Sequence, residues 1–219
     1  FWACMLGGIV AVALAPGIND EHRRKFFHVL SQLGRPHLCS DERTFSRLAD
    51  FAVAHGLASA FEKLRPASVL IDQIDDVSVP GKIYPAQPDD IAFVQYPSGS
   101  TSEPKGVTLS HRNLLTNIAA IAHGMDLQTQ DTALSRMPLT HDMGLIGFHL
   151  TWLVSDITHF LMPTALFVRR PSLWLLKASQ KRATLLCSPN FGYKHYLKTC
   201  NAANLGQLDL SAVRLIFNG

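Results

Sequence analysis

The sequence carries little charge and shows no clustering of basic residues. Only 17% of its 219 residues are charged, against roughly 25% in an average soluble domain. A complete small domain needs a charged surface, so we interpret the chain as a piece of a larger domain. The chain opens at Phe1 without an initiator methionine and stops at Gly219, directly after a strand-like segment, and we expect both ends to be cut points. A net charge of +3 with scattered Lys and Arg argues against nucleic-acid binding, which favours a basic stripe.

Cysteines and long apolar runs are also scarce. The four cysteines have no CxxC spacing, so we expect neither a disulfide scaffold nor a zinc site. We expect a reducing, cytoplasmic setting instead. The apolar run from 1 to 15 is interrupted by two glycines and stops at Pro16. It is too short to span a bilayer and lacks the basic region of a signal peptide. We expect it to form a buried helix end followed by a buried strand, and we expect no membrane span.

Short apolar segments alternate with amphipathic ones along the whole chain. Expected strands are 9–15, 36–39, 68–71, 91–96, 107–109, 158–162, 184–187 and 213–217. Expected helices are 19–33, 44–55, 111–124 and 190–199, with another beginning at Pro171. Asn19 and Ser110 are the expected helix N-caps. This alternation predicts an α/β fold of layered, mostly parallel sheets flanked by helices. We divide it into a first α/β part (1–74), an Asp- and Pro-rich connection (75–90) and a second part (91–219).

The strongest local signal is the polar loop between Tyr96 and Gly106. It follows an expected buried strand and is rich in hydroxyls and glycine, which suits an anionic ligand such as a polyphosphate. Lys105 adds a mobile positive charge. No Gly-Lys-Ser/Thr follows, so the loop is not a Walker P-loop. The candidate phosphate-binding residues are Ser98, Gly99, Ser100, Thr101 and Lys105.

This loop resembles the phosphate loop of the adenylate-forming enzymes, approximately Thr-Ser-Gly-Ser/Thr-Thr-Gly-x-Pro-Lys-Gly. Residues 98–101 and 104–106 match it as they stand. Pro97 replaces the usual Thr and so removes a hydroxyl and a backbone N–H donor. Ser102 replaces the usual Gly.

Three later segments narrow the resemblance to the fatty acyl-AMP ligase branch of that superfamily. They are Met137-Pro-Leu-Thr-His-Asp-Met-Gly-Leu-Ile-Gly147, Cys187-Ser-Pro-Asn-Phe-Gly-Tyr193 and Leu215-Ile-Phe-Asn-Gly219. The last resembles the start of an adenine-binding turn. Residues 160–174 are further similar to loading ligases of lipopeptide and polyketide synthetases. The chain is therefore expected to be part of the large N-terminal domain of an adenylate-forming enzyme.

The resemblance implies ATP-dependent activation of a fatty acid to an acyl-adenylate, with release of pyrophosphate and transfer to an acyl carrier protein, separate or in the same polypeptide. The implied cofactors are ATP and Mg²⁺, with no metal ligands in the chain itself. His141 and Asp142 would be catalytic, and Asn218 and Gly219 would lie on the adenine side. The implied acyl-pocket residues are Met143, Gly144, Asn190 and Phe191.

Other interpretations of these residues stay open. A neighbouring His–Asp pair is often structural. Phe191 and Tyr193 are core aromatics by default. Arg169 and Arg170 are either solvent-exposed residues that precede a helix or a contact for an acidic carrier protein. Two other functions are a fatty acyl-CoA ligase and a silent relative that acts as an interaction module. The family's remaining adenine turn, ribose-binding aspartate and C-terminal lysine domain have no counterpart in 1–219. We therefore expect these residues alone to bind ATP poorly and turn over negligibly.

Overall fold

The computed structural model describes residues 1–15, 19–75, 77–97, 105–200, 206 and 208–219. The chain forms two compact units, one of Phe1–Ala86 with Ile91–Thr108 and one of Gln87–Asp90 with Leu109–Gly219. Both are α/β, and five strand pairs, two in the first unit and three in the second, are parallel, which confirms the expected fold class. Among the described residues, no helix combines the length and apolar character needed to cross a bilayer.

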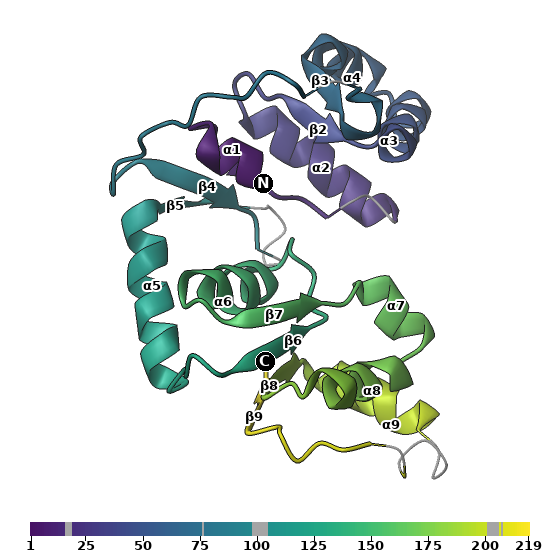
Figure 1. Ribbon diagram of the computed structural model, residues 1–219. Coiled ribbons are helices and arrows are strands. Elements are labelled where there is room, and N and C mark those ends of the chain that lie inside the picture. Colours follow the sequence, from purple (N-terminus) through teal and green to yellow (C-terminus); the bar gives the residue numbers. More distant parts are fainter. Residues whose placement is uncertain (16–18, 76, 98–104, 201–205, 207) are drawn as a thin grey trace. The chain divides into compact units, whose positions relative to one another are not determined.

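The first unit contains two small sheets (Figure 1). In the three-stranded sheet the order is β1 (Ala11–Val12), β4 (Ile91–Gln95), β5 (Val107–Ser110), and Ala11 lies opposite Phe93. The other sheet pairs β2 (Leu38–Ser40) with β3 (Ser68–Leu70). The helical segments are α1 (Trp2–Leu6), α2 (Asp20–Gln32), α3 (Glu42–Ala54), α4 (Ala58–Leu64), η1 (Arg65–Ala67) and η2 (Ile71–Gln73).

The core of the first unit is aromatic. It is built mainly from α2, α3 and α4, and its buried members are Phe27, Phe45, Leu48, Phe51, Ala52 and Phe61. The expected cap is present, because Asn19 Oδ1 accepts a hydrogen bond of 2.9 Å from the His22 N–H at the start of α2. This bond satisfies one of the N–H groups that a helix start leaves without a partner.

The second unit is organised around a four-stranded parallel sheet in the order β7 (Thr158–Leu161), β6 (Thr132–Ser135), β8 (Leu185–Ser188), β9 (Leu215–Asn218). Its helices are α5 (His111–Gly124), the π-helix η3 (Met143–Leu150), α6 (Thr151–Val154), α7 (Thr164–Arg169), α8 (Ser172–Lys181) and α9 (Asn190–Thr199).

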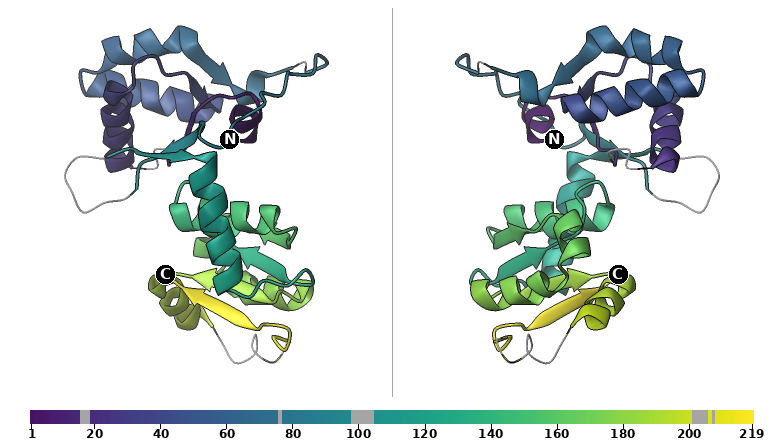
Figure 2. Two further views of the ribbon diagram at one scale, coloured as in Figure 1. Left: turned by 90° about the vertical axis from the view of Figure 1, so that its left-hand side faces the viewer. Right: turned by 90° about the vertical axis from the view of Figure 1, so that its right-hand side faces the viewer.

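Helices lie on both faces of this sheet (Figure 2), and its central strands β6 and β8 are buried on both faces. Successive side chains of a strand point to opposite faces. In β6, Leu134 packs with residues of α7, α8 and α9, whereas Ala133 packs with residues of η3 and α6. Leu186 and Leu185 of β8 alternate in the same way. The two central strands are therefore apolar on both sides, as a parallel sheet covered by helices requires.

The structure corrects several sequence expectations. The segment 1–15 is less buried than expected: α1 has no buried residue, Ile9 and Val10 are exposed, and the expected strand 9–15 is reduced to β1, where Ala11 is buried. Ser110 caps α5 as expected: its Oγ accepts from the Asn113 N–H, and its own N–H donates to Asn113 Oδ1. Within α5, Leu114 and Ile118 are buried, whereas Leu115 is exposed. Pro171 was expected to be the first residue of its helix, but it is the N-cap of α8, whose first helical residue is Ser172.

Candidate functional site

The predicted motif segments of the second unit follow the carboxyl ends of its central strands. β6 ends at Ser135 before the segment 137–147, β8 ends at Ser188 before Asn190, and β9 ends at Asn218. Parallel strands present their carboxyl ends at one edge of the sheet, which is the usual ligand-binding edge of open α/β sheets. Segments far apart in the sequence are thus gathered at one edge.

The side chains of His141 and Asp142 are in contact at the start of η3. His141 Nδ1 lies 2.6 Å from Asp142 Oδ1, and the two side chains are 45% and 56% exposed. The Met143 N–H donates to Asp142 Oδ1 at 2.7 Å, so Asp142 also caps the π-helix. The Met143 N–H also lies 3.3 Å from His141 Nδ1, so Nδ1 faces groups of the chain itself and Nε2 is the ring nitrogen on the opposite side. The pair is accessible and has a fixed orientation.

Gly144 and Met143 lie where η3 packs against its neighbours. Gly144 is buried, and a Cβ at this position would overlap the Pro138 carbonyl oxygen. The Met143 side chain packs against Gly219, because a Cβ at Gly219 would overlap Met143 Cε and Sδ. The structure therefore brings a predicted acyl-pocket residue into contact with a predicted adenine-side residue.

Asn190 and Asn218 also meet. Asn218 Nδ2 donates a hydrogen bond of 2.8 Å to Asn190 Oδ1, which joins the first turn of α9 to the end of β9. Nearby, the Tyr193 hydroxyl donates to the Phe217 carbonyl oxygen at 2.5 Å, and burial raises the pKa of Tyr193. Phe191 is 61% exposed at the same helix start, so it is not a core aromatic.

Arg136, which the sequence analysis did not single out, is buried beside these groups. It follows β6 and is 1% exposed. Its guanidinium donates to Ser188 Oγ and lies against the rings of Phe167 and Phe191. A single Arg between a short strand and an apolar motif gives no local sign of burial, so the sequence offered no signal for it.

The predicted phosphate loop belongs to the first unit. Ser98, Gly99, Ser100 and Thr101 lie outside the described residues, and Lys105 is exposed just before β5. The loop's start is held by Lys25 of α2, whose Nζ donates to the carbonyl oxygens of Tyr96 at 3.0 Å and Pro97 at 3.1 Å. Its end is tightly packed, since a Cβ at Gly106 would lie 2.9 Å from the Tyr96 ring. Sequence reasoning missed Lys25, which lies 71 residues away from Tyr96.

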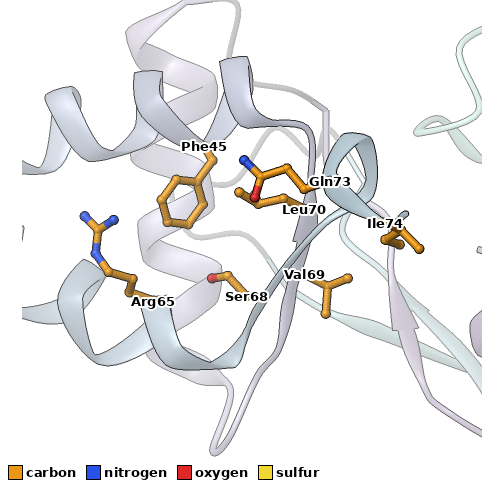
Figure 3. Close-up of a pocket in the computed structure, with 7 residues that line it drawn as sticks. All are labelled: Phe45, Arg65, Ser68, Val69, Leu70, Gln73 and Ile74. Atoms are coloured by element: carbon orange, nitrogen blue, oxygen red, sulfur yellow. The ribbon is translucent and has the colours of Figure 1, made fainter. Parts of the chain in front are cut away.

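Two further observations concern metal-binding groups and a cavity among the described residues. They contain no group of three or more His, Cys, Asp or Glu side chains placed to hold a metal ion. A cavity of about 410 Å³ in the first unit contains no predicted site residue (Figure 3). Its lining residues are Phe45, Arg65, Ser68, Val69, Leu70, Gln73 and Ile74.

The chain is similar to proteins named as a synthetase and as a ligase. A Caulobacter vibrioides protein named as an acyl-CoA synthetase is 34% identical over 96% of this chain. TtuA of Teredinibacter turnerae, a medium-chain-fatty-acid–[acyl-carrier-protein] ligase, is 31% identical over the whole chain. The chain spans 36% and 39% of the lengths of these two relatives.

A solved structure shows the same fold. The fatty acyl-adenylate ligase of Legionella pneumophila, in complex with acyl adenylate and pyrophosphate, aligns with 99% of this chain and 36% of that one, at 29% identity and a TM-score of 0.80. The family model described as AMP-binding enzyme matches residues 1–219. The chain therefore belongs to the AMP-binding enzyme family.

Proposed function

We propose that the protein activates a fatty acid with ATP, forming an acyl-adenylate and releasing pyrophosphate, and that the acyl group passes to an acyl carrier protein. We also propose that residues 1–219 correspond to part of the large N-terminal domain of such a ligase. The first α/β part would be 1–74, the connection 75–90, and the phosphate-loop and acyl-pocket part 91–219.

One observation carries this proposal: three motif segments meet at the carboxyl edge of the second unit's sheet. Met143 lies against Gly219, and Asn190 is hydrogen-bonded to Asn218. These are the residues for which the family resemblance implies acyl and adenine contacts. A chance likeness of isolated motifs would not require such contacts between them.

The reaction needs positioning more than proton transfer. A carboxylate oxygen attacks the α-phosphorus of ATP, the bond to the bridging oxygen of the β-phosphate breaks, and pyrophosphate leaves with that electron pair. The nucleophile is already ionised, so the site must align two anions and stabilise the charge that develops on the phosphate. His141 and Asp142, exposed and held in one orientation, would stand where the carboxylate enters.

The other predicted site residues would bind the phosphates of ATP and the acyl chain. Ser98, Gly99, Ser100, Thr101 and Lys105 would hold the β- and γ-phosphates. Phe191, Met143 and Gly144 would line the acyl chain, whose burial contributes about 0.8 kcal/mol per methylene group. Mg²⁺ would enter with ATP, since this ion is commonly held through substrate phosphates with few protein ligands. A cytoplasmic location stays a prediction.

The test uses protein extended beyond both ends of 1–219, incubated with Mg-ATP and a medium-chain fatty acid, with products identified by mass spectrometry. We expect acyl-AMP that coenzyme A does not consume and that a carrier protein does. Conversion to acyl-CoA would favour the acyl-CoA ligase function, which the name of the Caulobacter vibrioides relative also supports. Absence of any adenylate from folded protein would contradict the proposal and favour a silent interaction module.

The His141→Ala variant tests whether His141 belongs to the proposed site. We expect this variant to lower kcat/KM for adenylate formation at least about tenfold, the usual scale for a positioned group. His123→Ala, at an exposed position near the end of α5, is the matched control and should retain full activity. Equal activities in both variants would remove His141 from the proposed site.

A further inference from the structure

Arg136 is a charged side chain enclosed by rings. Its Cζ lies 3.7 Å from the ring centre of Phe167, 5.5 Å from that of Trp174 and 5.7 Å from that of Phe191. The residue is 1% exposed. Cation–π contacts with three rings stabilise a desolvated guanidinium, although they do not use its N–H donors.

Those donors are incompletely satisfied. Among the described residues, the guanidinium donates to Ser188 Oγ, its Nε is buried without a hydrogen-bond partner, and Arg136 forms no ion pair with a carboxylate. Burial lowers the pKa of Arg136. A buried cation without a counter-charge, and a buried N–H without an acceptor, both cost free energy. An oxygen acceptor brought by a ligand would recover that cost.

The backbone of α9 passes close to the guanidinium at Gly192. A Cβ at Gly192 would overlap both Arg136 Nη2 and Ser188 Oγ. The side chain therefore lies directly beneath the first turn of α9, which carries Asn190 and Phe191. Phe167 and Trp174 are buried, whereas Phe191 is 61% exposed. Of the three rings around the guanidinium, Phe191 is thus the one in contact with solvent, and it lies at the edge where the acyl pocket is proposed.

We propose that Arg136 forms a polar floor of the acyl pocket and selects carboxylic acids whose tails carry an oxygen acceptor. A hydroxyl, keto or second carboxylate oxygen would accept from the guanidinium, whereas a plain hydrocarbon tail would leave the buried donor unpaired. Sites built to pair with a polar group discriminate strongly against substrates that lack it. This inference rests on the proposed adenylating function and adds the class of acyl substrate.

The test compares three acids of equal carbon count in the extended protein: a plain alkanoate, its ω-hydroxy form and the α,ω-dicarboxylate. Pyrophosphate release gives kcat/KM for each acid, over a series of chain lengths. We expect the best oxygenated acid to exceed its plain counterpart by about tenfold or more, the effect of one unpaired buried donor. Arg136→Met should abolish or reverse this preference, and Arg136→Gln, which keeps a neutral donor, should retain part of it.

Arg214→Lys is the matched control. Arg214 lies at the other end of the same sheet, just before β9, where it pairs with Asp131. We expect this variant to lose stability and to keep the wild-type acid preference. Binding is measured separately by the tryptophan fluorescence of the wild type, because Trp174 lies against Arg136. The oxygenated acid should perturb this signal more than the plain acid does.

The outcomes separate the two proposals. Equal use of plain and oxygenated acids by the wild type, or an unchanged preference in Arg136→Met, overturns the role of Arg136 and leaves adenylation standing. If Arg136→Met does not fold, Arg136→Gln and the wild-type fluorescence decide. Failure of every acid to give an adenylate refutes the proposed function itself.

Discussion

At the scale of single residues, Asp131 links protonation to stability. Burial by itself raises the pKa of its carboxyl, but hydrogen bonds from Arg214, Thr184 and the Gln128 N–H outweigh this and lower it to about 2. An aspartate in an unfolded chain has a pKa near 3.9. A lowered pKa stabilises the folded state above the unfolded value, and this stabilisation disappears as pH falls through the folded value.

Asp131→Asn should therefore remove a pH-dependent term. We expect the wild type to exceed the variant in free energy of unfolding at pH 7, and about 2 kcal/mol of this difference to disappear between about pH 4 and pH 2. Urea unfolding at several pH values measures it. A difference that stays constant across that range would show that the carboxyl is not held ionised by its partners.

At the scale of elements, η3 depends on one of its two glycines. Gly144 has no room for a Cβ beside the Pro138 carbonyl, whereas a Cβ at Gly147 would make an ordinary contact of 3.9 Å with Met143. We expect Gly144→Ala to destabilise the protein by about 1–3 kcal/mol, as overpacking does. Gly147→Ala should be neutral or stabilising by up to about 1 kcal/mol, because alanine favours helices. Urea unfolding followed by tryptophan fluorescence compares them, and equal effects would contradict the packing argument.

At the scale of the whole molecule, the share of the relatives' length that the chain spans bears on the proposed chemistry. The chain spans 36% and 39% of the two relatives above, and in-line transfer between two anions needs groups from every side of the reacting centre. We expect residues 1–219 by themselves to release pyrophosphate at a negligible rate, whereas the extended protein turns over. The same pyrophosphate assay measures both, and steady-state turnover by 1–219 alone would show that the remaining parts are dispensable.

The sequence alone determined the elements with strong local signals. Ser110 and Asn19 predicted helix starts through their capping side chains, and α9 has the predicted bounds of 190–199. The motifs likewise indicated the family, because a motif is defined by the order of its residues along the chain and can be recognised without the structure. In contrast, β6 was not predicted: its sequence Thr-Ala-Leu-Ser has little strand character of its own, and it forms because it pairs with β7 and β8 and is buried on both faces.

Tertiary structure alone decided which of these residues meet. Nothing local places Met143 against Gly219, joins Asn190 to Asn218 or buries Arg136 among aromatic rings. The same holds for η3, whose two glycines disfavour a helix until packing on the sheet compensates. Capping and hydrophobic periodicity act over a few residues and can be recognised in the chain. Strand register and the burial of a charge depend on partners distant in sequence, and these are set when the sheet assembles.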